Sequence, residues 1–160
     1  MPLSGVGVSD KIMNHFRNNP LGYGSTFQSH PASLACAYAV VKYLVDNNIV
    51  EHVQKMEKVI ENEMQKLIND DENVSVAQGR VYGMGGCIDL MNPDTMDILC
   101  STNEQHPLGM ELKKNFNKNG VISIIKGPVV HIAPPLISKP EDIEYAFSML
   151  KKSLWETFNK

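Results

Sequence analysis

A hydroxyl-rich turn is the first stretch of the chain with the means to bind a ligand. Residues 22–31 read GYGSTFQSHP, and a long apolar helix pattern follows. Ser25 and Thr26 carry hydroxyl donors, and a helix N-terminus presents free N–H groups and a partial positive charge. Such a turn suits an anion such as phosphate, or it is only a loop in which Ser29 caps a helix that begins near Pro31. It is not a P-loop, because the lysine and the GxxxxGK spacing are absent.

Arg80 and the histidines are the other side chains with chemical potential. Arg80 precedes a glycine-broken strand, GRVYGMGG, that does not match the dinucleotide-binding fingerprint GxGxxG. An arginine in this place forms a structural ion pair or contacts a substrate. The five histidines show no metal-ligand spacing, His131 lies mid-strand, and no Ser-His-Asp or Cys-His arrangement can be read. The residues alone therefore indicate no metal site and favour a binding or supporting role.

Composition limits the possible partners. The chain has 160 residues and a net charge of −3, which suits one domain, or one domain of a larger protein, and gives no reason to expect nucleic acid. It contains no apolar run long enough for a membrane span and no signal peptide. Cys36, Cys87 and Cys100 have no CxxC spacing, so we expect reduced, mostly packed thiols in an intracellular compartment.

Apolar periodicity predicts the elements that must position these side chains. It places the following residues on the inward faces of the helices: Ile12, Met13, Phe16, Leu34, Ala37, Tyr38, Val41, Leu44, Val45, Val53, Met56, Ile60, Met64, Leu67, Leu108, Leu112, Phe116, Ile143, Ala146, Phe147, Leu150 and Leu154. Helices are expected at 10–19, 32–46, 50–68, 107–118 and 139–156, and strands from Val74 and Val76, over 79–91, and at 121–125 and 129–133. Gly120 suits a helix end, and Lys126-Gly127-Pro128 suits a hairpin turn. The stretch 138–141 reads as a capping box with proline in the first turn. This order predicts an α+β fold, an antiparallel sheet with helices packed on one face.

Several segments together resemble a known family. PLSGVGVS, GSTFQSHPASLACAYAVVKYL, GRVYGMGGCIDL and HIAPPLIS occur in the order seen in the C-terminal part of class III pyridoxal-phosphate-dependent aminotransferases, most like the branch acting on ω-amino acids and amines. The resemblance implies the small C-terminal domain of a fold-type I enzyme that works as a homodimer. It assigns 1–29 to the large-domain and dimer-interface region and 30–160 to the small α+β domain. It also implies that Thr26, with Ser25 beside it, binds the phosphate of pyridoxal 5'-phosphate held by the neighbouring subunit.

Two departures from the family pattern shape the expected activity. The lysine that forms the family's Schiff base lies upstream of the segment matching MPLSGV, so we expect it before Met1, no catalytic residue in this chain, and no transamination by the chain alone. The apolar, glycine-rich start also indicates truncation. Many members carry an arginine that grips a substrate carboxylate where His131 stands here, with Lys126 the closest cation and no other arginine near. An ω-amino acid or an amine is therefore favoured as donor, with a 2-oxo acid as acceptor.

Two other functions stay open at this point. One is a non-catalytic dimerisation or interaction domain, and the other is a lyase or aminomutase on the same fold, since reaction type is set mostly in the large domain. We expect an intracellular protein, cytoplasmic or mitochondrial, with no metal and no membrane partner.

Overall fold

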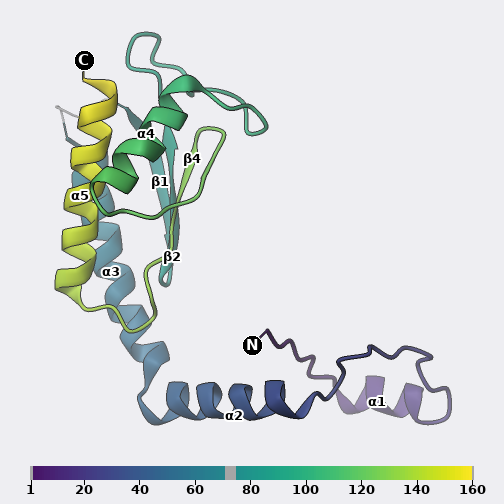
Figure 1. The fold of residues 1–160 in the computed structure, drawn as a ribbon. Helices are drawn as coiled ribbons and strands as arrows, with labels where there is room; N and C mark the ends of the chain where they lie inside the picture. The colour runs from purple at the N-terminus through teal and green to yellow at the C-terminus, as the bar shows by residue number, and fades with distance from the viewer. Residues whose placement is uncertain (1, 71–74, 160) are drawn as a thin grey trace. The chain divides into compact units, whose positions relative to one another are not determined.

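The computed structural model describes residues 2–70 and 75–159, and the chain divides between Asn48 and Ile49 into two compact units. The first unit contains α1 (Asp10–Arg17) and α2 (Pro31–Asp46). The second contains, in chain order, α3 (Ile49–Ile68), β1 (Val76–Tyr82), β2 (Gly85–Leu90), α4 (Pro107–Lys118), β3 (Ile125–Lys126), β4 (Val129–Ile132) and α5 (Pro140–Phe158) (Figure 1). Val74, expected in the first strand, lies outside the described residues. The predicted domain boundary between residues 29 and 30 concerns the whole protein and stays a prediction.

The first unit exposes its apolar side chains. None of the residues of α1 and α2, all of which the structure describes, is buried. The stripe of α1 expected to face inward is exposed at Ile12, Met13 and Phe16. In α2, Tyr38 and Val45 are more than two-thirds exposed, at 72% and 69%. The packing of α2 on the sheet therefore stays a prediction.

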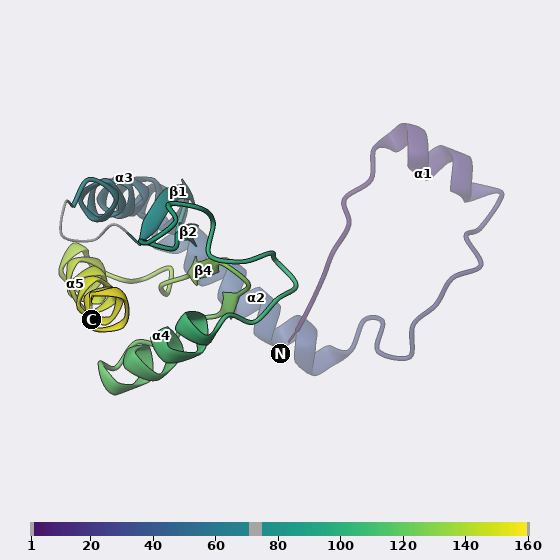
Figure 2. The same ribbon diagram turned by 90° about the horizontal axis from the view of Figure 1, so that it is seen from above.

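The second unit is built on a four-stranded antiparallel sheet in the order β1-β2-β4-β3. Figures 1 and 2 show α3, α4 and α5 on the same side of this sheet. The core lies between the two layers, where Ile88, Leu90 and Val130 of the strands are fully buried. The helices contribute the stripes predicted from periodicity, with the buried residues Met56, Ile60, Met64, Leu67, Leu112, Phe116, Ile143, Phe147, Leu150 and Leu154. The α+β prediction is confirmed, although Ala146, expected in the α5 stripe, is exposed.

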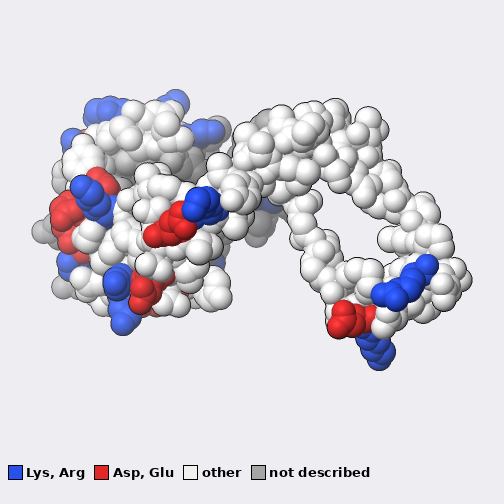
Figure 3. Space-filling model, turned by 90° about the horizontal axis from the view of Figure 1, so that it is seen from below, with Lys and Arg blue, Asp and Glu red and all other residues white. Residues whose placement is uncertain are grey.

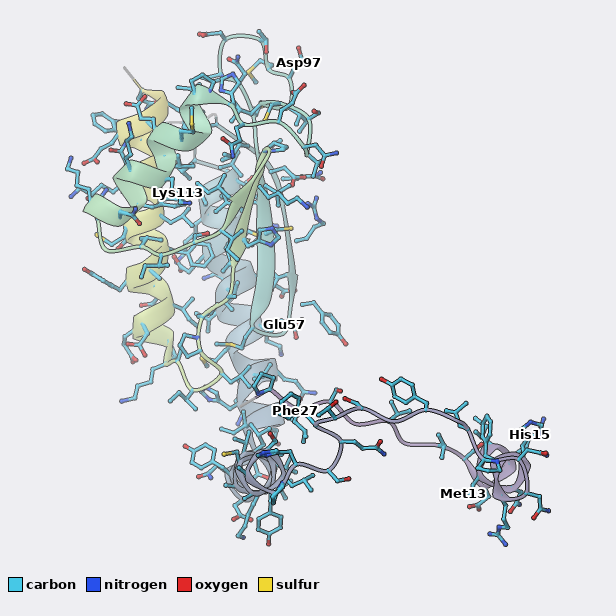
Figure 4. The ribbon with its side chains drawn as sticks, turned by 45° about the vertical axis from the view of Figure 1, so that its right-hand side comes forward. Met13, His15, Phe27, Glu57, Asp97 and Lys113 are labelled. Atoms are coloured by element: carbon cyan, nitrogen blue, oxygen red, sulfur yellow. The ribbon has the colours of Figure 1, made fainter. Side chains whose placement is uncertain are left out.

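The boundary between the first two strands was predicted wrongly. Gly79 to Tyr82 belong to β1. Tyr82 pairs with Gly85, which shows that the chain reverses through Gly83 and Met84. Gly83 has φ +58°, a left-handed conformation that glycine adopts without strain. The carboxylate of Glu57 on α3 accepts a hydrogen bond from the Gly83 N–H at 2.9 Å and holds this turn against the helix (Figure 4).

The second hairpin is present but shorter than predicted. Lys126 pairs with Val129, so Gly127 and Pro128 form the turn, as the sequence indicated. β3 has only two residues, whereas 121–125 was expected. Upstream, the Ser123 hydroxyl donates a 2.6 Å hydrogen bond to the carbonyl of His131. The Ser123 hydroxyl thus occupies a backbone carbonyl of β4 that a backbone N–H of a longer β3 would otherwise bond. This competition explains why β3 is short.

The cap of α5 differs from the prediction, and α4 has a histidine cap for which no prediction was made. The N-cap of α5 is Lys139, whose N–H donates to the Asp142 carboxylate at 2.9 Å, and Pro140 occupies the first turn. The predicted capping box with Ser138 and Glu141 is thus displaced by one residue, because Lys139 takes the extended N-cap conformation. At α4 the N-cap is His106, whose Nδ1 accepts a hydrogen bond from the Leu108 N–H at 3.3 Å.

Candidate functional site

The hydroxyl-rich turn is formed by backbone hydrogen bonds immediately before α2. The Gln28 N–H donates to the Ser25 carbonyl at 2.9 Å, and the His30 N–H donates to the Phe27 carbonyl at 3.3 Å. Ser29 has φ +58°, and the N-cap of α2 is His30, which makes no side-chain capping bond. The prediction that Ser29 caps the helix was therefore wrong, because Ser29 lies one residue too early and in a left-handed conformation.

The hydroxyls of this turn are available to a ligand. Ser25 and Thr26 are exposed, and within the described chain neither hydroxyl makes a hydrogen bond. The charged side chains nearest in sequence are Arg17 and Lys42, and the uncharged stretch between them is visible in the first unit (Figure 3). An anion at this turn would be held by neutral donors, the two hydroxyls and nearby backbone N–H groups. The residues present thus fit a phosphate.

A second group of polar side chains lies on the face of the sheet opposite the helices, here called the open face. Ile88, Leu90 and Val130 point to the core, so the alternate residues of β2 and β4 lie on the open face. Arg80 pairs with Cys87, and Cys87 pairs with His131. These three residues form a cross-strand row, and strand spacing places the ends of the row roughly 10 Å apart.

Arg80 is engaged by Asp89. The two outer nitrogens of its guanidinium each donate a 2.7 Å hydrogen bond to a different oxygen of the Asp89 carboxylate. Gln78 Nε2 donates a third, also at 2.7 Å. The bonds from Arg80 and, more weakly, from Gln78 hold the pKa of the Asp89 carboxyl below its usual range against the effect of burial. The pKa of the Arg80 guanidinium is raised, mainly by Asp89 and then by Cys87. Arg80 thus forms the structural ion pair that was one of its two predicted roles, and a contact with substrate stays a prediction.

His131 is exposed on β4 and fixed through its backbone. Its N–H donates to the Ile124 carbonyl at 2.9 Å, and its carbonyl accepts from Ser123. Within the part of the chain that the structure describes, its imidazole has no hydrogen-bond partner. Nothing in the sequence indicated that Arg80 and His131 are related, whereas the pairing of β1 with β2 and of β2 with β4 places them at the two ends of one cross-strand row. Sequence reasoning also missed Asp89 and Gln78, whose alternation along the strands was the available signal.

Other features of the described residues give no additional site. Within residues 2–70 and 75–159, no three His, Cys, Asp or Glu side chains are placed to hold a metal ion, and no helix is long and apolar enough to cross a membrane. The three cysteines are free, and Cys36 is exposed, so the expectation of packed thiols fits only the half-buried Cys87 and Cys100.

Comparisons with known proteins identify the family of the chain. The aminotransferase class-III family model matches residues 1–154. The gamma aminobutyrate transaminase 1, mitochondrial, of Solanum lycopersicum is 25% identical over 98% of this chain and 30% of its own length. The putrescine–pyruvate aminotransferase of Pseudomonas aeruginosa is 26% identical over 98% of this chain and 34% of its own. The chain thus spans about a third of the length of these relatives.

A solved structure of the same kind shares the fold. The taurine:2-oxoglutarate aminotransferase from Bifidobacterium kashiwanohense, in complex with PLP and glutamate, superposes with a TM-score of 0.85 at 21% identity, over 94% of this chain and 34% of that one. The family match over nearly the whole chain, together with this fold, shows that the chain belongs to the class III aminotransferases.

Proposed function

We propose that the whole protein is a pyridoxal-phosphate-dependent transaminase that moves an amino group from an ω-amino acid or an amine to a 2-oxo acid, and that these residues are its C-terminal part. Family membership supports the reaction class. Two of the relatives are named as transaminases of gamma-aminobutyrate and of putrescine, which supports the donor class. The coverage of about a third of each relative supports a small domain that works with a larger one.

Ser25 and Thr26 are the residues that would hold the cofactor. Their free hydroxyls and the backbone N–H groups near the start of α2 offer several donors to one phosphate. In the proposed homodimer that phosphate belongs to the cofactor of the neighbouring subunit. When bound, pyridoxal phosphate supplies the carbonyl that takes up the amino group and the electron sink for the reaction.

The chain alone is proposed to be inactive. The reaction requires a lysine that links the cofactor and shuttles a proton. Lys11, Lys42 and Lys126 do not stand in the sequence context of that lysine. The catalytic lysine would therefore be supplied by the large domain, with this chain closing one side of the cleft.

The proposed class of donor rests mainly on the position and exposure of His131. By the resemblance given above, this exposed imidazole takes the place of an arginine that many family members carry, and the arginine in its row is paired with Asp89. The open face thus lacks a free guanidinium fork beside His131, which a 2-amino acid carboxylate would need for a bidentate contact. A donor without that carboxylate next to its amino group fits better, and the carboxylate of the 2-oxo acid acceptor would be held by groups outside this row.

The proposal is tested with the full-length holoenzyme. At saturating pyruvate, we expect 4-aminobutyrate and butylamine to react with a higher kcat/KM than 2-amino acids. His131→Arg should raise the kcat/KM for 2-amino acids by about tenfold, the value of one bidentate charge-assisted contact. Lys126→Arg, which adds a fork at another position of the open face, is the matched control and should change nothing.

Other outcomes would replace the proposal. A wild-type preference for 2-amino acids that is insensitive to His131→Arg would remove the donor assignment. Cofactor binding without turnover of any donor would favour the non-catalytic interaction domain. An intracellular location, cytoplasmic or mitochondrial, is part of the proposal and is checked by fractionation.

A further inference from the structure

The geometry points to Asp89 as a residue that determines specificity between donors with and without a carboxylate. This inference rests on the proposed function. By engaging the fork of Arg80, Asp89 withholds a carboxylate clamp from a ligand bound at His131. Carboxylate-bearing donors therefore receive no help from the one arginine that shares the row with His131.

The Asp89 carboxylate occupies the place that a substrate carboxylate would take. Its two oxygens meet the two outer nitrogens of Arg80 at 2.7 Å each, which is the fork geometry of carboxylate recognition. Gln78 adds a third donor and fixes the carboxylate in this position. Asp89 is only 7% exposed, so it is a permanent partner and not a surface charge that exchanges with solvent.

Arg80 itself has the exposure of a residue able to bind a ligand. Its side chain is 53% exposed, far more than that of Asp89, so one side of the guanidinium faces solvent. The arginine side chain is long enough to cover much of the roughly 10 Å that separates the ends of the row. The pairing of β1 with β2 places Asp89 opposite Gln78, two residues along each strand from the pair of Arg80 and Cys87. The Arg80 guanidinium therefore bonds its diagonal neighbour Asp89 and does not extend along the row toward His131. Because the two charges of the pair are opposite, the pair exerts little net attraction on an anion bound farther away.

Two variants and two matched donors test this inference in the full-length holoenzyme. The donors are 4-aminobutyrate and butylamine, which differ in the carboxylate at one end, with pyruvate saturating. Asp89→Asn should free the fork and raise the ratio of kcat/KM for 4-aminobutyrate to that for butylamine by about tenfold. Adding Arg80→Met to Asp89→Asn should abolish the gain.

Each result decides the matter. An unchanged ratio in folded Asp89→Asn, or a gain that survives Arg80→Met, would overturn the inference. A tenfold fall below the wild-type ratio in the double variant, which lacks both charges of the pair, would show that Arg80 serves substrate in wild type and would also overturn the inference. This arm decides even if Asp89→Asn alone does not fold. Calorimetric binding of glutarate, a dicarboxylate, gives a readout without turnover. Glutarate affinity that rises about tenfold in Asp89→Asn would support the inference even if the protein proved not to be a transaminase.

Discussion

Replacing Thr26 with valine tests the assignment of the hydroxyl-rich turn to phosphate. Valine keeps the branched shape and removes only the hydroxyl. Thr26 is exposed and its hydroxyl has no hydrogen bond within the described residues, so the substitution should not change the free energy of unfolding. One charge-assisted hydrogen bond to a phosphate is worth roughly 1.5–3 kcal/mol. The dissociation constant of pyridoxal phosphate should therefore rise by about tenfold to a hundredfold.

The assay is a titration of full-length cofactor-free enzyme with pyridoxal phosphate, followed by the absorbance of the cofactor. Thr26→Ser keeps the hydroxyl and should lose less affinity than Thr26→Val. Pyridoxal without its phosphate should bind wild type and Thr26→Val equally, because the missing bond is to the phosphate. Thr95→Val serves as a control outside the turn. Equal affinity of wild type and Thr26→Val for the phosphorylated cofactor would refute the assignment.

Three further predictions concern the second unit and are checked by chemical unfolding of the chain. A Cβ at Gly79 would overlap the buried Met64 side chain at Sδ and Cγ, so Gly79→Ala should cost about 1–3 kcal/mol through overpacking, and an unchanged midpoint would contradict the packing. Asn119 donates to two side chains of α5, at 2.9 and 3.2 Å, so Asn119→Ala should cost about 1–2 kcal/mol while exposed Asn117→Ala costs almost nothing. The pKa of Asp89 is lowered by its partners, so its contribution to stability is present above about pH 4 and lost as pH falls further. The difference in unfolding free energy between wild type and Asp89→Asn should therefore shrink between pH 7 and pH 3, and a constant difference would count against the ion pair.

The helices and the second hairpin could be predicted because their signals are local. The 3.6-residue periodicity of α3 placed Met56, Ile60 and Met64 in the core, where the structure has them. Proline and glycine at 127–128 indicated a turn that the structure confirms. The first hairpin was harder, because GMGG offers several glycines that tolerate a left-handed turn, and only the pairing partner decides that Gly83 takes it.

The candidate site could be predicted residue by residue but not as an arrangement. The hydroxyls of Ser25 and Thr26 were evident from their types, whereas His131 was singled out by the resemblance to the family. The row that joins Arg80 to His131 depends on the register of β2 against β4, which are separated in sequence by the whole of α4. Such a long-range register follows from the folded topology and has no local signal.

The most direct test of the proposed transaminase follows the nitrogen itself. The full-length holoenzyme is incubated with pyruvate and 4-aminobutyrate labelled with nitrogen-15, and alanine is analysed by mass spectrometry. The proposed reaction predicts labelled alanine in an amount equal to the donor consumed, and none with the 160-residue chain alone. Consumption of the donor without labelled alanine, with the label released as ammonia or retained on a rearranged donor, would contradict it and identify a lyase or an aminomutase.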